Sequence, residues 1–113
     1  MKFRSPKQRK AVMAKMRYGM IGPCNRTVTK VIDGDTFRVA KNVGGSKNIR
    51  LAGVNAPEIG EYGAAKATKD LKGMIDRKPV HINPVATDKY GRTVAEITQD
   101  RHNINKRMKD RGY

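Results

Sequence analysis

Residues 27–54 read TVTKVIDGDTFRVAKNVGGSKNIRLAGV, and this stretch decides the fold. It contains three runs rich in β-branched residues, at 27–32, 36–40 and 48–54, with clusters of turn residues between them. Asp33-Gly34-Asp35 separates the first two runs and Gly44-Gly45-Ser46 separates the second pair. An Asp-Gly pair between two such runs favours a tight hairpin. The sequence therefore predicts a meander of three strands.

The remainder of the chain extends this pattern with helices and further strands. Residues 61–77 have the composition of a helix, and residues 80–83 alternate so that Val80 and Ile82 point inward and His81 points to solvent. A fifth strand is expected at 93–98 and a closing helix from His102, which carries Ile104. The apolar face expected for the first helix consists of Ala64, Ala67, Thr68, Leu71, Met74 and Ile75. The order βββ-α-ββ-α predicts a mainly β protein with helices (α+β), built as a five-stranded OB-type barrel.

The N-terminal segment differs from the rest in charge. Residues 1–26 hold eight Lys and Arg side chains and no carboxylate, and Ser5-Pro6 is typical of a helix start. Its apolar residues Val12, Met13, Met16 and Met20 recur at helical spacing. We therefore predict a short basic N-terminal helix or arm over 1–26, with Cys24 in a linker, before a barrel domain over 27–113. Two interpretations stay open: this helix packs on the domain, or it contacts phosphates.

The overall charge indicates the class of partner. The 113 residues include 25 Lys and Arg against 10 Asp and Glu, so the formal net charge is 25 − 10 = +15. A surplus of this size suits a polyanion, most often nucleic acid, with an anionic membrane surface as the lesser option. A basic surface that binds nothing, as in some proteins of thermophiles, is the remaining alternative.

Several classes of protein are excluded. One cysteine cannot form an internal disulfide, and no Cys/His cluster has the spacing of a zinc site. No apolar run approaches the ~20 residues that a membrane span requires. The first residues also lack the apolar stretch of a secretory signal, so we expect a cytoplasmic protein.

Three carboxylates lie close to the expected ends of strands. Asp33 and Asp35 flank the first turn, and Glu58 follows the third strand. Carboxylates at the rim of a basic barrel can hold a hard cation, because Ca²⁺ and Mg²⁺ prefer oxygen ligands. The alternative is that Asp33 only forms the turn and Glu58 is only a loop residue after Pro57.

Three segments together resemble a known family. They are VIDGDT at 31–36, IRLAGVNAPE at 49–58 followed by Tyr62-Gly63, and TDKYGR at 87–92. In order and spacing they are similar to the IDGDT, IRLxGIDAPE and TDKYGR signatures of the staphylococcal nuclease-like (thermonuclease) family. The resemblance covers residues 27–113 and implies an OB-type barrel that hydrolyses phosphodiester bonds in DNA and RNA.

The resemblance also implies a metal ion, usually Ca²⁺, with Mg²⁺ or Mn²⁺ as alternatives. By position, Asp35 would be a carboxylate ligand and the Ala56 carbonyl a backbone ligand. This chain has Asn55 where the family usually has a second Asp. An amide oxygen can still bind Ca²⁺, but the site loses one negative charge, so we expect weaker binding or an altered metal preference.

The same resemblance assigns roles around the scissile phosphate. Arg50 and Arg92 would hold it from two sides, since the planar guanidinium group can meet phosphate oxygens bidentately. Glu58 would activate or orient the attacking water, and Lys89 and Tyr90 would contact the nucleic-acid phosphates. A second departure is that the family continues beyond the position of Tyr113 with a segment whose aromatic residues stack on bases. We expect that stacking to be reduced and hypothesise that the basic N-terminal segment partly replaces it.

The leading interpretation is a metal-dependent nuclease with low sequence specificity. The alternative is a catalytically weakened or inactive nucleic-acid-binding OB module, which Asn55 and the missing aromatic segment favour. A protein-interaction module is a weaker third possibility, because fold alone does not fix function. The expected partner is nucleic acid (DNA and/or RNA), with no membrane and no obligate protein partner, and the protein is expected to be a monomer.

Overall fold

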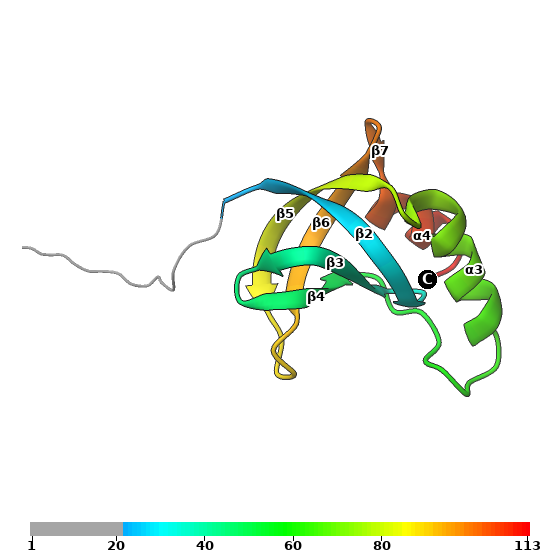
Figure 1. Cartoon of the computed structure of the whole chain (residues 1–113). Helices are drawn as coiled ribbons and strands as arrows, with labels where there is room; N and C mark the ends of the chain where they lie inside the picture. Colours follow the sequence, from blue (N-terminus) through cyan, green and yellow to red (C-terminus); the bar gives the residue numbers. More distant parts are fainter. Residues whose placement is uncertain (1–21) are drawn as a thin grey trace, which may run out of the picture.

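The computed structural model describes residues 22–113 and contains the predicted barrel with its helices (Figure 1). The expected N-terminal helix lies outside the described residues. Along the chain the elements are β2 (Cys24–Asp33), β3 (Thr36–Val43), β4 (Ser46–Leu51), α3 (Ala64–Ile75), β5 (Pro79–Thr87), β6 (Thr93–Gln99), β7 (His102–Asn103) and α4 (Ile104–Asp110). The order βββ-α-ββ-α is therefore confirmed, with the two-residue strand β7 as an addition.

The five long strands close into a barrel. They are ordered β4-β3-β2-β5-β6, and β4 also pairs with β6. This last pairing is parallel and joins Ile49, Arg50 and Leu51 to Thr93, Val94 and Ala95, whereas the other ladders are antiparallel. Closure removes the free edges of the sheet. It also brings the end of β4 next to the start of β6, where two of the expected site residues lie.

The core fills the barrel and continues under both helices. Phe37, Ile49, Leu51, Ile82 and Ile97 are fully buried in the barrel. The buried face of α3 consists of Ala64, Ala67, Leu71 and Ile75, and Met74 packs partly against the same core. Figure 1 shows α3 and α4 together at one end of the barrel. The helical periodicity read from the sequence is thus confirmed for these positions.

Several boundaries differ from the expected ones. Strand β4 ends at Leu51 and not at Val54, and helix α4 begins at Ile104 and not at His102. Strand β2 begins at Cys24, which pairs with Ile82 of β5, so Cys24 lies in the sheet and not in a linker. Strand β5 continues to Thr87, past Pro84, where the ladder with β6 shifts register. Helix α3 begins at Ala64, because Gly63 directly before it has a left-handed φ of 84°.

A buried asparagine connects α4 to the barrel and to the loop after β4. Asn105 accepts a hydrogen bond from the Ile97 N–H at 2.9 Å, and its amide nitrogen donates to the carbonyl oxygens of Ala52 and Ala95 at 2.9 and 3.1 Å. All of the side chain's bonds go to main-chain groups, so each buried polar atom is satisfied. The interaction fixes the chain immediately before the candidate site.

The turn between β2 and β3 approaches its neighbours very closely. A Cβ atom placed on Gly34 would lie 2.6 Å from the Cβ atoms of both Ala56 and Ala67. Gly34 has no positive φ. The glycine is therefore required here for space, and it lets the turn contact both α3 and the loop after β4.

We predict that Gly34→Ala destabilises the protein by about 1–3 kcal/mol, the usual cost of overpacking. The matched control is Gly73→Ala in α3, where an added Cβ meets nothing within 4 Å. Since alanine favours a helix over glycine, the control is expected to stabilise by up to about 1 kcal/mol. Urea unfolding monitored by circular dichroism measures both, and equal effects of the two substitutions would contradict the proposed crowding at Gly34.

Candidate active site

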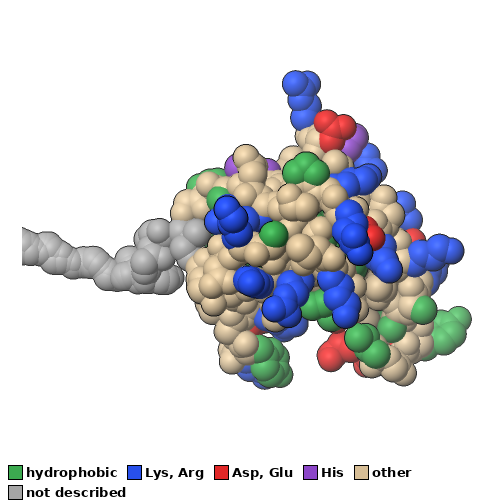
Figure 2. Space-filling model, in the orientation of Figure 1, with side chains coloured by type: hydrophobic (Ala, Val, Ile, Leu, Met, Phe, Trp, Pro, Cys, Tyr) green, Lys and Arg blue, Asp and Glu red, His purple; other side chains and the backbone are tan. Residues whose placement is uncertain are grey.

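One cleft gathers most of the residues predicted from the sequence. It lies where the β2–β3 turn, the end of β4, the loop between β4 and α3, and the β5–β6 hairpin meet, and its volume is about 470 Å³. Figure 2 shows it as an indentation at the lower edge of the molecule, between the β5–β6 hairpin and the loop that leads to α3. It is lined by Asp35, Arg50, Asn55, Ala56, Glu58, Tyr90 and Arg92, and also by Asp33 and Asn48. Of the predicted site residues, only Lys89 does not line it.

Asp35 is the best-anchored carboxylate of the cleft. The residue is 7% exposed, and its Oδ1 accepts a hydrogen bond from the Thr36 hydroxyl group at 3.0 Å. Its Oδ2 accepts from the Ala56 N–H at 3.3 Å and lies 3.4 Å from Nη2 of Arg50. One carboxylate thus links the hairpin turn to β4 and to the loop that precedes α3.

Arg50 projects from the end of β4 along the same side of the cleft. Its Nη1 donates to the Leu51 carbonyl at 3.1 Å, and its Nη2 donates to Oδ1 of Asn55 at 3.0 Å. With Asp35, these contacts fix the plane of the guanidinium group. The guanidinium is held mainly by neutral acceptors, so most of its positive charge is available to an anion in the cleft.

Arg92 reaches the cleft from the β5–β6 hairpin and is oriented by Asp88, which had no predicted role. Its Nε donates to Oδ2 of Asp88 at 2.6 Å, and its Nη1 donates to the Thr36 hydroxyl at 3.3 Å. Oδ1 of Asp88 also accepts from the N–H groups of Tyr90 and Arg92, both at 2.9 Å. Burial raises the pKa of Asp88, but these hydrogen bonds outweigh it and hold the pKa below its usual range. Asp88 is therefore a positioning residue for Arg92.

Asp33, the second carboxylate of the β2–β3 turn, has a raised pKa, whereas that of Asp88 is lowered. Burial, then the hydrogen bond and the negative charge of Asp35, raise the pKa of Asp33 to about 6. Oδ1 of Asp33 accepts the Asp35 N–H at 3.1 Å. Two carboxylates two residues apart share this turn, and at neutral pH their mutual repulsion favours a cation beside them.

Glu58 extends from a short turn before α3. Its N–H donates to Oε1 of Glu61 at 2.7 Å, and the Glu61 N–H donates to the Glu58 carbonyl at 2.9 Å. This reciprocal pair resembles a capping box and fixes the Glu58 backbone. Glu61, expected only as the first residue of the helix, therefore positions Glu58, whose exposed side chain stays free to meet a ligand.

Tyr90 and Lys89 form the outer rim of the cleft on the β5–β6 hairpin. The Tyr90 side chain is 72% exposed, and the Lys89 Nζ and Arg92 Cζ atoms lie 5.2 and 5.3 Å from its ring centroid. Both distances fit cation–π contacts. The ring is therefore in contact with two cations, of which only Arg92 lines the cleft.

Two further groups contribute to the cleft without having been predicted. Oδ1 of Asn48 is buried and has no hydrogen-bond partner, so an acceptor is available at the cleft wall. The Tyr113 carbonyl accepts from the Asn55 N–H at 3.0 Å, while its hydroxyl group donates to Asp70 at 3.2 Å. Tyr113 is therefore held at both its carbonyl and its hydroxyl group, and it supports the loop that carries Asn55. Neither contact has a signal in the sequence.

The oxygen donors around Asp35 are of the type that binds a hard cation, but few of them are negatively charged. The carboxylates of Asp33 and Asp35, the Asn55 amide oxygen and the Ala56 carbonyl are all oxygen donors of the kind that Ca²⁺ and Mg²⁺ accept. Within residues 22–113, no group of three His, Cys, Asp or Glu side chains is close enough together to hold a metal. A cation here would therefore depend on two carboxylates and on neutral oxygens.

Comparisons with known proteins find a matching family model and several relatives that are named as nucleases. The model of the family described as staphylococcal nuclease homologue matches residues 48–113. An uncharacterized endonuclease of Haemophilus influenzae is 30% identical over 100 residues, which cover 84% of this chain and 56% of the relative. A micrococcal nuclease of Shigella flexneri is 33% identical over 70 residues, covering 62% of this chain and 40% of the relative. Endonuclease YhcR of Bacillus subtilis is 31% identical over 102 residues, covering 76% of this chain and 8% of the relative.

These relatives are longer than the matched region. The chain spans 56% of the Haemophilus protein and smaller shares of the other two. Within the described part of the chain, neither helix is long and apolar enough to cross a membrane.

The pKa of Asp33 predicts a specific dependence of stability on pH. A folded-state pKa of about 6, against 3.8 for a free aspartate carboxyl, means that the folded protein binds the proton more tightly than the unfolded chain does. This contribution is complete below pH ~4 and is lost as the pH rises through about 6. The loss is expected to be no more than about 1–2 kcal/mol, because solvent screens a half-exposed group.

In Asp33→Asn the amide retains the acceptor and does not titrate, so this loss is expected to disappear. Free energies of unfolding measured in EDTA between pH 4 and pH 8, for wild type and variant, test this. Asp76→Asn, at the end of α3, is the control. Parallel pH profiles for wild type and Asp33→Asn would contradict the assignment.

Proposed function

Because this chain belongs to the family of staphylococcal nuclease homologues, we propose that it is a metal-dependent nuclease that hydrolyses phosphodiester bonds in DNA and/or RNA with low sequence specificity. The observation that carries the proposal is that Asp35, Arg50, Glu58 and Arg92 line one cleft although they come from four different segments. This set contains a cation ligand, two anion-binding groups and a proton acceptor, which together suffice for phosphodiester hydrolysis.

The two arginines would bind the scissile phosphate from opposite sides. Arg50 is held by the Leu51 carbonyl and by Asn55, and Arg92 is held by Asp88 and Thr36, so both guanidinium groups are oriented before substrate arrives. Attack on the phosphorus places additional negative charge on the equatorial oxygens. Preorganised donors stabilise that charge more strongly than water does.

Glu58 is the proton acceptor in this proposal. A water oxygen forms a bond to phosphorus while its proton passes to the Glu58 carboxylate, and the bond from phosphorus to the leaving sugar oxygen breaks. The leaving oxygen then takes up a proton, so that the products are a phosphate monoester and a sugar hydroxyl. The Glu61 contact holds the Glu58 backbone in place during the step.

Asp35, Asn55 and the Ala56 carbonyl are the groups that would hold the cation, with Asp33 adding charge beside them. We propose Ca²⁺, with Mg²⁺ or Mn²⁺ as alternatives. When bound, such an ion polarises a phosphoryl oxygen and offsets the charge of the phosphate. Tyr90 and Lys89 at the rim would contact the adjacent phosphates.

The alternative function is a nucleic-acid-binding module with weak or no turnover. One specific observation favours it. Position 55 carries a neutral amide instead of a carboxylate, and the oxygen of this amide already accepts a hydrogen bond from Arg50. A site with so little negative charge binds divalent ions less tightly.

The central prediction concerns cleavage by the purified protein. Single-stranded DNA, duplex DNA and RNA are incubated with Ca²⁺, Mg²⁺, Mn²⁺ or EDTA, and products are resolved on denaturing gels. We expect cleavage that EDTA abolishes, and a loss of about 10²–10⁴-fold in rate for Glu58→Gln and for Arg50→Ala.

The matched controls are Glu96→Gln and Arg38→Ala, which change the same residue types at exposed positions outside the cleft. Both controls should cleave at the wild-type rate. Nucleic-acid binding without cleavage under every metal would establish the binding module instead.

A second prediction concerns residue 55. Asn55→Asp adds a carboxylate beside Asp35, so we expect Ca²⁺ to bind about tenfold or more tightly, as ligand charge governs affinity. Isothermal titration calorimetry of the wild type, Asn55→Asp and the control Asn42→Asp on β3 measures this. An Asn55→Asp variant that binds Ca²⁺ no better than wild type would refute the assignment of residue 55 as a ligand.

A further inference from the structure

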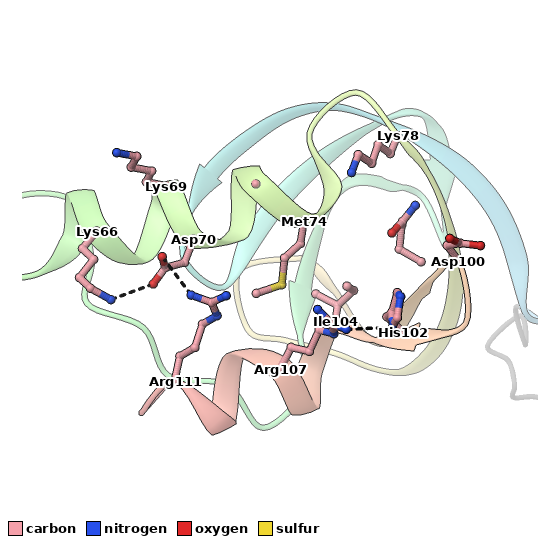
Figure 3. Close-up of a pocket in the computed structure, with 12 residues that line it drawn as sticks. Lys66, Lys69, Asp70, Met74, Lys78, Asp100, His102, Ile104, Arg107 and Arg111 are labelled. Carbon is pink, nitrogen blue, oxygen red and sulfur yellow. Dashed lines mark hydrogen bonds and ion pairs between the residues drawn. The ribbon is translucent and has the colours of Figure 1, made fainter.

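A second hollow lies away from the cleft, between the two helices and the β6–β7 turn. We call it the helix groove; its volume is about 730 Å³ (Figure 3). Figure 3 shows Met74 of α3 and Ile104 of α4 between the helices, with charged side chains around them. The groove lies among elements that the proposed chemistry does not use.

The charge of the groove is strongly unbalanced. Its lining includes five Lys and Arg side chains and two carboxylates. The basic residues are Lys66, Lys69, Lys78, Arg107 and Arg111, and the acidic ones are Asp70 and Asp100. The basic residues come from α3, from α4 and the residue after it, and from the turn before β5. In Figure 3, Lys66, Lys78, Arg107 and Arg111 surround one space, whereas the Lys69 side chain extends away from it.

Asp70 neutralises only part of this charge. It lies 3.1 Å from Nζ of Lys66 and 3.4 Å from Nη1 of Arg111, and the two cations therefore share one carboxylate. The hydrogen bond from Lys66 lowers the pKa of Asp70, so the carboxylate stays ionised at neutral pH. One positive charge remains in excess at this end of the groove.

At the other end of the groove, Asp100 is the carboxylate that lies near Lys78 and His102 (Figure 3). Arg107 lies 2.9 Å from Nδ1 of His102. A guanidinium group can only donate, so the ring nitrogen is the acceptor and the contact orients Arg107 without cancelling its charge. Among the described residues, Lys78 forms no ion pair.

Such an arrangement costs free energy unless an anion is bound. Arg107 on α4 and Arg111 directly after this helix are four residues apart, and Lys66 and Lys69 are three apart on α3; like charges at these spacings repel. The dipole of α4 favours basic residues in its last turn. That reason does not apply to Lys66 and Lys69, which lie in the first half of α3.

The groove and the cleft are connected through one residue. The Tyr113 hydroxyl donates to Asp70 in the groove, and the Tyr113 carbonyl accepts from the Asn55 N–H at the cleft. The two sites are therefore separated by no more than one tyrosine and two hydrogen bonds. A chain of a few nucleotides can reach from one to the other.

We propose that the helix groove binds the sugar-phosphate backbone of the same nucleic-acid strand whose scissile bond occupies the cleft. The identity of the ligand rests on the proposed function, whereas the site rests on the convergence of cations. The groove makes the protein prefer substrates long enough to occupy both sites, and its contacts are with phosphates, so they add no sequence preference.

The test compares two double charge reversals. Lys78→Glu with Arg107→Glu alters the groove, and Lys41→Glu with Lys47→Glu makes the same change of charge on the β3–β4 hairpin, on the opposite side of the barrel from α3 (Figure 1). Binding of a single-stranded DNA of about 30 nucleotides is measured by fluorescence anisotropy in EDTA, over a range of salt concentrations. In the groove variant we expect the Kd to rise about tenfold or more and the salt slope to fall by about 1.4, at ~0.7 for each lost phosphate contact.

Cleavage assays with metal provide the second readout. The groove variant should cleave a dinucleotide at the wild-type kcat/KM and should lose kcat/KM only on the long strand. Equal weakening by the two double variants, or unchanged affinity in the groove variant, would overturn the proposal. It would also be overturned if the groove variant lost binding to phosphatidylserine vesicles but kept its affinity for DNA.

The binding measurements in EDTA do not depend on catalysis. If the wild type binds DNA but cuts nothing, the nuclease proposal fails while the groove is still tested in EDTA. Thermal melts check that the variants are folded. If the groove double variant is unfolded, Lys78→Glu against Lys41→Glu repeats the comparison with single exposed lysines.

Discussion

The close contact of the β2–β3 turn with its neighbours is the constraint on which the candidate active site depends. Gly34 has no room for a Cβ between Ala56 and Ala67, so the turn, the loop after β4 and helix α3 are held against one another. Asp35 follows directly, and its carboxylate bonds the Ala56 N–H and faces Arg50. Packing at one residue therefore sets the spacing of the charged groups beside it.

Much of the fold and of the site could be predicted because the information is local. The β-branched runs, the Asp-Gly turn and the apolar face of α3 each follow from residues close together in the chain. The site residues were predictable because three short segments are similar to family signatures. The parallel pairing of β4 with β6 was not predictable in the same way, because it joins strands about 40 residues apart and depends on barrel closure.

The contacts that support the site could not have been predicted from the sequence, because most of them join residues that only the folded chain brings together. Asn105 bonds Ala52 from 53 positions away, and Tyr113 bonds Asp70 from 43 positions away. Asp88 and Glu61 are closer to the residues they orient, but a turn aspartate and a helix-start glutamate are common where no site exists. The pKa of Asp33 depends on how far the turn is buried, and burial is a property of the folded chain.

Asn55 has two opposing consequences for the cleft. If it serves as the proposed ligand, its neutral amide offers a cation less negative charge than a carboxylate would, and metal affinity falls with ligand charge. As a neutral acceptor it also holds Arg50 less strongly than a carboxylate would, since a negative charge would add Coulombic attraction to the hydrogen bond. Asp35 is then the one carboxylate that pairs with Arg50 among the described residues, so the guanidinium group can bind a phosphate while breaking few ionic contacts. In the proposed mechanism, an amide in place of a carboxylate at residue 55 would thus weaken the cation site and leave Arg50 more available, so that phosphate binding would depend more on the arginines.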